Sequence, residues 1–304
     1  MSFSLRVSTP VRPLVDLALM GLLLVIVENF ARIWGPPTSR GFFCDDQTLM
    51  YPYNENTISS SLLHLLGLYL PLLSLFLVES LLCRSKGASS WSHYWPVYNV
   101  VRWFLYGYVF NDLLKSIGKQ TIGRLRPHFF AACRPVFPDG TTCADVGRQG
   151  VSEYHEDYVC QPQISGASQE VLKDMLVSFP SGHSAMAFYG LVFVALHIRR
   201  RRWPLEGSLL GPVIQLVCVA VAWFVALSRV MYYKHHWSDV AAGSLLGVVA
   251  AFLAVRAAAI EESQRMSPDA PATLAGPAET KNSEESRAYP VHPDLGLVTC
   301  QSSN

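Results

Sequence analysis

Residues 208–227 read SLLGPVIQLVCVAVAWFVAL, and this stretch decides the fold class. It is apolar apart from Gln215, and the next charged residue along the chain is Arg229. A hydrocarbon core of about 30 Å is crossed by about 20 such residues in a single α-helix. The stretch therefore predicts a membrane-spanning helix.

The composition of the whole chain supports this interpretation. Half of the 304 residues are hydrophobic and only 15% are charged, with a formal net charge of +1. Average soluble domains carry about a quarter charged residues, so an ordinary cytosolic enzyme is disfavoured. The high hydrophobicity excludes disorder as the main state. The balanced charge gives no support to a nucleic-acid partner.

Five further apolar runs predict helices of the same kind. The first is the weakest, because its uncharged part lies only between Asp16 and Glu28, but no small-residue cleavage site of a signal peptide follows it. The last is rich in Gly, Ala and Ser, which let membrane helices approach closely. Together with 208–227, the runs predict an all-α polytopic membrane protein with six transmembrane helices. They are residues 14–33, 59–82, 96–117, 185–198 and 240–255.

Basic residues in the short loops predict the orientation of these helices. Arg199, Arg200, Arg201 and Arg202 separate the fourth and fifth runs, and loops rich in Lys and Arg face the cytosol. We therefore expect residues 1–13 to be a cytosolic N-terminus and 14–260 to be the membrane domain. Residues 261–304, rich in Pro, Ser, Glu and Ala, are expected to form a disordered cytosolic tail. Outer loops then fall at about 34–58, 118–182 and 228–238.

Four of the seven cysteines lie in the predicted outer loops, where disulfides persist. These are Cys44, Cys133, Cys143 and Cys160, and the sequence leaves all three pairings open. None has a neighbouring histidine or a helix start that would lower its thiol pKa, so structural disulfides are favoured over a catalytic thiol.

Three polar clusters lie at the predicted outer ends of the helices. They read KQTIGRLRP at 119–127, FPSGHS at 179–184 and SRVMYYKHHWSD at 228–239. Lys119, Arg126 and Arg229 supply three cations. Ser181 can cap the helix that follows it, which leaves the N–H groups of Gly182 and His183 free to bind an anion. Phosphate suits such a site, because arginine matches its oxygens with a bidentate fork and lysine adds a point charge.

Two histidines in these clusters could carry out chemistry on the phosphate. His235 and Asp239 are four residues apart and would share a helix face, so the carboxylate can orient the imidazole. One ring nitrogen of His235 is then free to attack phosphorus, while His183 protonates the leaving alkoxide and later takes a proton from water. The pattern predicts phosphomonoester hydrolysis through a phosphohistidine.

The three clusters resemble the signature of the type 2 phosphatidic acid phosphatase superfamily: Lys-x6-Arg-Pro, Pro-Ser-Gly-His and Ser-Arg-x5-His-x3-Asp. Residues 40–45, RGFFCD, together with 122–127 and 233–239, resemble the animal lipid phosphate phosphatases. The resemblance covers about residues 10–260. It implies that His235 is the nucleophile, that His183 is the acid and base, and that Asp239 is the partner of the nucleophile.

The resemblance also implies the phosphate-binding residues and the substrates. The expected phosphate binders are Lys119, Arg126, Ser181, Gly182 and Arg229, with no metal ion and no cofactor. Expected substrates are phosphatidate, lysophosphatidate, sphingosine 1-phosphate and ceramide 1-phosphate, presented at the extracellular or luminal leaflet. The plasma membrane is the first expectation for the compartment, with the endoplasmic reticulum or Golgi as alternatives. The bilayer is a partner, nucleic acid is not, and a homo-oligomer is left open.

Several other interpretations compete with this one. Lys119, Arg124 and Arg126 could be basic flanks of a span, and His235, His236 and Asp239 could bind a metal, although the nearby cations would repel it. A non-catalytic lipid-binding relative would lack the signature histidines. A transporter would show repeats between its halves. A phosphatase for polyprenyl diphosphates or sugar phosphates could share the signature.

Overall fold

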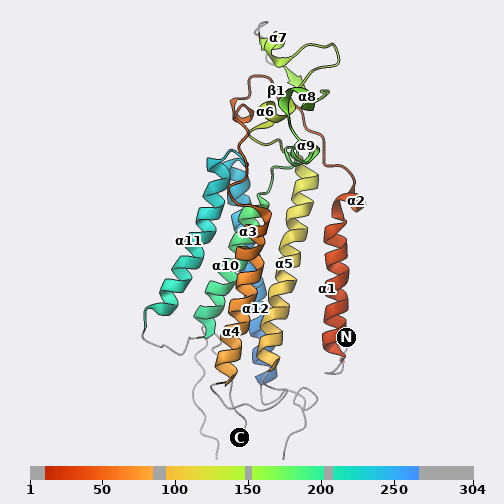
Figure 1. The fold of residues 1–304 in the computed structure, drawn as a ribbon. Coiled ribbons are helices and arrows are strands. Elements are labelled where there is room, and N and C mark those ends of the chain that lie inside the picture. Colours follow the sequence, from red (N-terminus) through yellow and green to blue (C-terminus); the bar gives the residue numbers. More distant parts are fainter. Residues whose placement is uncertain (1–10, 85–93, 148–152, 202–207, 267–304) are drawn as a thin grey trace, which may run out of the picture.

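The computed structural model describes residues 11–84, 94–147, 153–201 and 208–266. Long helices stand side by side as a bundle, and α1 begins at the end of the bundle where α12 ends (Figure 1). One of them is composite, since a short α-helix and a π-helical segment lead into it. The bundle consists of α1 (Arg12–Glu28), α3 (Ser60–His64) with η2 (Leu65–Tyr69) and α4 (Leu70–Arg84), α5 (Tyr94–Ile122), α10 (Gly182–Arg201), α11 (Leu210–Met231) and α12 (Trp237–Met266).

The helices carry the apolar surface of a membrane protein. Within the described residues, three stretches are long and apolar enough to cross a membrane: Ser60–Leu82, Leu210–Met231 and Trp237–Arg265. On α11, Leu216, Trp223 and Phe224 are more than half exposed, and a large exposed apolar surface marks contact with membrane or protein. The expectation of a mostly helical membrane protein is confirmed. The count of six spans stays a prediction.

Helix α10 lies at the centre of the bundle, and most of its side chains are buried. Small residues bring its neighbours close. A Cβ on Gly190 would lie 2.2 Å from the carbonyl oxygen of Gly67, and a Cβ on Gly247 would lie 2.4 Å from that of Ala185. Both are closer than real Cβ contacts allow, so glycine at these points lets η2 and α12 pack directly on the backbone of α10.

Buried ion pairs tie the helices together at the end where α12 terminates. Arg102 of α5 pairs with Asp16 of α1 and with Glu261 of α12, while Arg201 of α10 pairs with Glu79 and Glu262. These pairs explain why α12 continues to Met266, so that residues 261–266, expected to begin the tail, are helical. The remainder of the expected tail and residues 1–10 lie outside the described residues.

A cap built from the loops covers the opposite end of the bundle (Figure 1). Phe42 is 2% exposed at its centre, packed against the rings of Phe129, Phe130 and Tyr158. The two strands pair antiparallel, with Phe42 opposite His155. The short elements of these loops are α2 (Phe30–Trp34), β1 (Phe42–Phe43), η1 (Gln47–Leu49), α6 (Phe129–Cys133), α7 (Cys143–Gly147), β2 (Tyr154–His155), α8 (Pro162–Ser165) and α9 (Gln169–Asp174).

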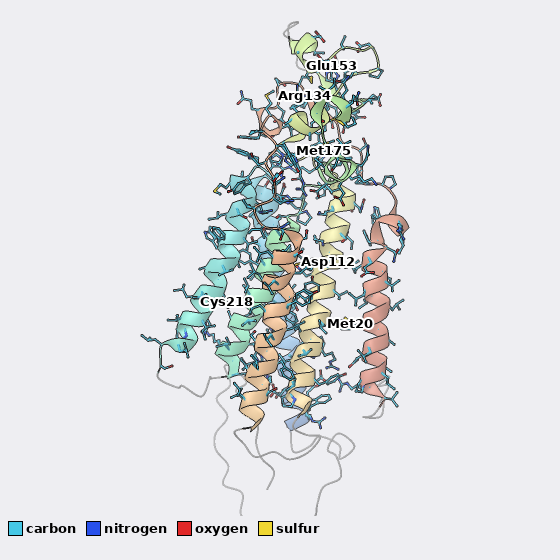
Figure 2. All side chains as sticks on the ribbon, viewed as in Figure 1. Met20, Asp112, Arg134, Glu153, Met175 and Cys218 are labelled. Atoms are coloured by element: carbon cyan, nitrogen blue, oxygen red, sulfur yellow. A yellow bond between two sulfur atoms is a disulfide. The ribbon has the colours of Figure 1, made fainter. Side chains whose placement is uncertain are left out.

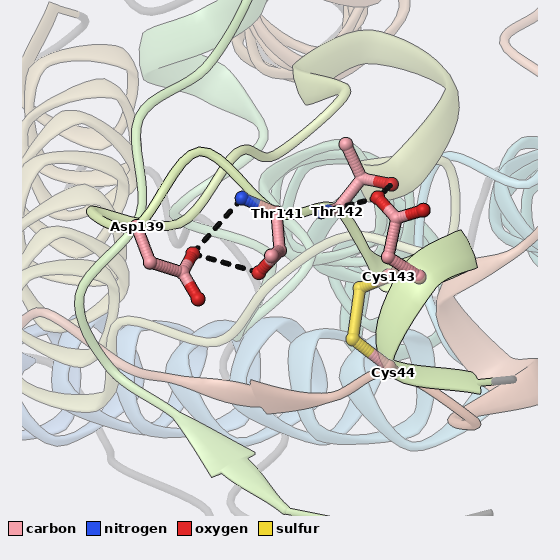
Figure 3. Close-up of a disulfide and its surroundings, with 6 residues drawn as sticks. Cys44, Asp139, Thr141, Thr142 and Cys143 are labelled. Atoms are coloured by element: carbon pink, nitrogen blue, oxygen red, sulfur yellow. Dashed lines mark hydrogen bonds between the residues drawn. A yellow bond between two sulfur atoms is a disulfide. The ribbon is translucent and has the colours of Figure 1, made fainter. Parts of the chain in front are cut away.

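Two disulfides join the segments of the cap, and they select one of the three open pairings. Cys44 of the first loop bonds to Cys143, and Cys133 bonds to Cys160. Figure 3 shows the first bond beside a turn in which the Asp139 carboxylate accepts hydrogen bonds from the backbone and hydroxyl of Thr141. Because the first bond links residues 99 positions apart, the two loops form one unit above the bundle.

Candidate functional site

The three polar clusters meet where the cap joins the bundle. Figure 2 labels Met175 at this junction, and its side chain is almost fully buried. Gly123 turns the chain out of α5 with a φ of +56°, and a Cβ there would lie 1.9 Å from the carbonyl oxygen of Thr38. The chain thus leaves the helix that carries Lys119 and runs directly across the top of the bundle.

Backbone hydrogen bonds hold the three clusters against one another. The N–H of Arg126 donates to the carbonyl of Met175 at 2.9 Å, and the N–H of Ser178 donates to the carbonyl of Arg124 at 2.8 Å. The N–H of Ser181 donates to the carbonyl of Asp239 at 3.0 Å. Segments far apart in the sequence are therefore fixed in register around one small space.

His235 and Asp239 approach each other without a direct hydrogen bond. The distance from Nδ1 of His235 to Oδ2 of Asp239 is 3.9 Å. Ser178 bridges the gap, because its hydroxyl donates to Oδ2 at 2.6 Å and lies 3.4 Å from Nδ1. A hydroxyl has one proton, and Ser178 uses it in the hydrogen bond to Asp239. The hydroxyl can therefore only accept a hydrogen bond from Nδ1–H of His235. This arrangement protonates Nδ1 and leaves the lone pair of His235 on Nε2.

Asp239 is fully buried and held by further donors. Arg124 Nη1 lies 2.6 Å from Oδ1, and the backbone N–H of His236 lies 3.1 Å from Oδ2. The ring of His236 contacts the carbonyl of Leu125 at 3.1 Å instead of joining His235. Within the described residues, no group of three or more His, Cys, Asp or Glu side chains is placed to hold a metal ion. Independence of metal stays a prediction.

Burial and charge keep the His235 imidazole neutral. The side chain is almost fully buried, and burial, followed by the charge of Arg126, lowers the pKa of His235 to about 3. Nε2 has no hydrogen-bond partner among the residues that the structure describes, whereas Nδ1 faces Ser178. A neutral imidazole with a free Nε2 is the form required of a nucleophile.

The first loop contributes to the site between the cap and α3. The ring of His183 contacts the carbonyl of Ile58 through Nε2 at 3.3 Å, and Arg229 Nη2 donates to the Thr57 hydroxyl at 3.1 Å. Arg229 is 1% exposed and also donates to Ser228. His183 and Arg229 thus contact the same segment of the first loop, although they are 46 positions apart in the sequence and lie on separate helices.

The start of α10 has the features expected of an anion-binding turn. The Ser181 hydroxyl accepts from the N–H of Ser184 at 3.5 Å, a long helix cap. The N–H groups of Gly182 and His183 have no backbone acceptor within the described ranges. A Cβ at Gly182 would lie 3.0 Å from Cδ of Lys115, so glycine keeps this turn close to α5.

Positive charge exceeds negative charge around this space. Lys119, Arg229 and Lys234 have no acidic partner in the described parts of the chain, and Arg126 pairs with Asp174 at 2.6 Å. Lys234 lies over the ring of Tyr53, with Nζ 4.0 Å from the centroid. Burial and then the charge of Arg126 lower the pKa of Lys234 to about 8. Cations that lower one another's pKa values in this way favour the binding of an anion between them.

Every residue predicted for the site lies at this junction, whereas several of their partners were missed. Lys119, Arg126, Ser181, Gly182, His183, Arg229, His235 and Asp239 are all found there; their chemical roles stay predictions. The missed side chains are Thr57, Arg124, Asp174, Ser178 and Lys234. Arg124 was considered only as a basic flank of a span, and Lys234 is recognisable as a cation within the third cluster. Thr57, Asp174 and Ser178 have no distinguishing signal in the sequence.

Known proteins resemble this chain over most of its length. The sequence profile of the PAP2 superfamily matches residues 100–261. A relative from Drosophila melanogaster is 38% identical over 235 residues, which cover 72% of this chain but only 61% of the relative. Phospholipid phosphatase 1 of Mus musculus is 37% identical over 224 residues, covering 71% of this chain and 74% of the relative.

Phospholipid phosphatase 2 of Homo sapiens is 36% identical over 224 residues, covering 72% of this chain and 73% of the relative. No solved structure matches the chain. The superfamily profile covers all three polar clusters, from Lys119 to Asp239, and the described helices that position them. The chain therefore belongs to the PAP2 superfamily.

Proposed function

We propose that this protein is a six-span membrane phosphatase that hydrolyses lipid phosphates at the outer or luminal leaflet without a metal ion. The observation that carries the proposal is the excess of buried cations around a neutral His235 whose Nε2 is free. The substrate class is the one named for its relatives, the phospholipid phosphatases. The expected substrates are phosphatidate, lysophosphatidate, sphingosine 1-phosphate and ceramide 1-phosphate.

In the first step, Nε2 of His235 attacks phosphorus, and the bond from phosphorus to the lipid oxygen breaks as the N–P bond forms. Ser178 and Asp239 stabilise the charge that grows on the imidazole, because Nδ1–H points toward them. Lys119, Arg126 and Arg229 stabilise the negative charge that spreads over the phosphoryl oxygens.

His183 moves the protons. Its Nε2 contacts the Ile58 carbonyl and is assigned as protonated, so Nδ1 exchanges the second proton. Burial and then the charge of Arg229 lower the pKa of His183 to about 3, and the negative charge of a bound phosphate dianion opposes this shift. Nδ1 therefore takes up its proton as the substrate binds, and in the first step Nδ1–H gives this proton to the leaving alkoxide. In the second step, Nδ1 takes a proton from water as the water oxygen attacks phosphorus, the N–P bond breaks, and inorganic phosphate is released. His183 ends the cycle in its starting protonation state.

The expected topology places this site outside the cytosol. α1 begins at the same end of the bundle as the C-terminus of α12, which fits an even number of crossings (Figure 1). The arginines at the end of α10 lie at that end, away from the cap. Disulfides persist in the extracellular space and the secretory lumen, which favours that side for the cap. We propose the plasma membrane as the compartment.

The nucleophile can be tested by phosphate release from lysophosphatidate in mixed micelles. His235→Ala should lower kcat by at least about a thousandfold, the order of loss seen when a nucleophile is removed. His64→Ala removes a histidine whose ring nitrogen contacts the carbonyl of Ser60 in its own helix turn, and it should leave the rate unchanged. Appreciable turnover by folded His235→Ala would refute the assignment. His183→Ala should still accept phosphate slowly and accumulate a labelled phosphohistidine.

Three further measurements test the rest of the proposal. Activity should persist in excess chelator, and loss that a divalent ion restores would contradict the metal-free mechanism. An epitope inserted after Gly140, in an exposed turn of the cap, should be reached only from outside the cytosol. A panel of lipid phosphates, polyprenyl diphosphates and sugar phosphates decides the substrate class. Faster hydrolysis of a water-soluble sugar phosphate would overturn it.

A further inference from the structure

Asp174 is an acidic side chain beside the cations of the proposed phosphate site. It is the last residue of α9, and its carboxylate Oδ1 lies 2.6 Å from Nη2 of Arg126. The exposure of the pair is uneven, because the Arg126 side chain is 7% exposed and the Asp174 side chain is 52% exposed. The carboxylate therefore closes over the guanidinium from the solvent side.

The backbone places the carboxylate there. Arg126 donates its N–H to the carbonyl of Met175, the residue after Asp174, and Ser178 donates its N–H to the carbonyl of Arg124. The two segments therefore run alongside each other, and the two side chains meet in register. The contact between Arg126 and Asp174 is therefore fixed by the backbone and does not depend on the conformation of a flexible surface side chain.

The guanidinium is only half satisfied by this contact. Arg126 Nε is buried and has no hydrogen-bond partner among the described residues. Nε–H and Nη2–H form one edge of the guanidinium, the fork that binds two oxygens of a phosphate side by side. Asp174 occupies the Nη2 half of that fork and leaves the Nε half empty. A buried donor without a partner is costly, so the fork favours a guest that fills both halves.

The charges around Asp174 give a second reason why a bound phosphate would displace its carboxylate from Arg126. Burial opposes ionisation, yet the charges of Arg126 and Lys119 hold the pKa of Asp174 below its ordinary value. The carboxylate is therefore negative at neutral pH, and a phosphate dianion on the same cations would be repelled by it. Asp174 and phosphate cannot both occupy the fork of Arg126.

We propose that Asp174 is a displaceable counter-ion of the phosphate site, which phosphate must push away from Arg126 to bind. This role rests on the proposed phosphatase function and extends it. The carboxylate neutralises part of the excess positive charge while the site is empty. It returns to Arg126 after hydrolysis and so competes with inorganic phosphate, which speeds product release.

The probe is inorganic phosphate, measured both as an inhibitor of lysophosphatidate hydrolysis and by the thermal stabilisation it gives the full-length protein in detergent. Asp174→Asn removes the negative charge but keeps the shape of the side chain. Because a partly exposed ion pair changes an equilibrium constant by up to about fivefold, phosphate should bind Asp174→Asn more tightly than wild type by up to about fivefold. KM should fall, and kcat should not rise.

Glu170→Gln is the matched control, because Glu170 lies in the first turn of the same short helix and is exposed. It loses the same charge and should bind phosphate like the wild type. Asp174→Ala serves as a second variant, since asparagine can still donate or accept a hydrogen bond. Unchanged or weaker phosphate binding in both folded Asp174 variants would overturn the proposal.

The two measurements separate failure of this proposal from failure of the proposed function. Thermal stabilisation by phosphate needs no turnover. If the protein hydrolyses no lipid phosphate but phosphate still stabilises Asp174→Asn more than wild type, the substrate assignment fails and the counter-ion role stands. If hydrolysis is rapid and the affinities are equal, the counter-ion role fails alone.

Discussion

Replacing Ser178 with alanine tests how Asp239 acts on His235. The Ser178 hydroxyl is the only side-chain atom among the described residues within hydrogen-bond distance of Nδ1 of His235, since Asp239 lies 3.9 Å away. Without the hydroxyl, nothing fixes the ring tautomer or carries the charge that develops on the ring to the carboxylate. We therefore expect Ser178→Ala to lower kcat while leaving KM nearly unchanged, because Ser178 does not contact the phosphate-binding cations.

The size of this effect follows from the two contacts that are lost. The 2.6 Å hydrogen bond to a carboxylate is charge-assisted, whereas the 3.4 Å contact to Nδ1 is long. A hydrogen bond to a charged group contributes about 1.5–3 kcal/mol. Since 1.36 kcal/mol corresponds to tenfold in rate, kcat should fall by about 10- to 100-fold. Asp239 keeps Arg124 and the N–H of His236, so the fold should tolerate the change.

The assay is phosphate release from lysophosphatidate in mixed micelles over a range of substrate concentrations. Ser74→Ala is the control, because its hydroxyl donates to the carbonyl of Pro71 within the same helix. A fall in kcat of less than about threefold in folded Ser178→Ala would refute the relay, judged against the tenfold per 1.36 kcal/mol relation. A change confined to KM would also refute it.

Removing the cap disulfide between Cys44 and Cys143 should lower the thermal inactivation midpoint more than removing Cys133–Cys160, because its loop is longer, 99 against 27 residues. Loop entropy predicts stabilisation of about 4.7 kcal/mol for the longer loop and about 3.5 kcal/mol for the shorter one. A larger fall on removing Cys133–Cys160 would contradict this prediction. Gly243→Ala should lower activity, since its Cβ would lie 2.4 Å from the Ser181 carbonyl and push α12 off the phosphate turn; wild-type kcat would contradict this. Burial and Arg126 lower the pKa of His235 to about 3, so the unfolded chain binds the extra proton first and stability falls as pH drops below about 6.5. Between pH 6.5 and 5 the free energy of unfolding of His235→Gln should fall less steeply than that of the wild type, with a difference in slope that approaches about 1.4 kcal/mol per pH unit. Thermal midpoints at each pH measure this, and equal slopes would refute a neutral imidazole.

The sequence was sufficient where a local pattern carries the information. An apolar run such as 208–227 predicts its helix, α11 (Leu210–Met231), because the hydrocarbon core demands length and hydrophobicity from each segment separately. The motifs were equally visible, since the residues of FPSGHS and KHHWSD are contiguous and chemically distinctive. Their meeting at one end of the bundle followed from counting spans.

Other features could not be predicted because they depend on which segments become neighbours. Ser178 resembles many other loop serines until the N–H of its backbone binds the carbonyl of Arg124 and turns its hydroxyl toward Asp239. Residues 261–266 were expected to be disordered because their composition is polar, yet buried arginines of α5 and α10 pair with Glu261 and Glu262 and extend the helix.

The sequence by itself determined the helical membrane class, the apolar runs and the identity of the groups predicted to react, because each of these is a property of a short stretch of chain. Tertiary structure alone decided the pairing of the four cap cysteines, the hydroxyl between His235 and Asp239, and the carboxylate that covers Arg126. The physical reason is range: hydrophobicity acts within one helix, whereas hydrogen bonds and ion pairs act over about 3 Å between residues that only folding brings together.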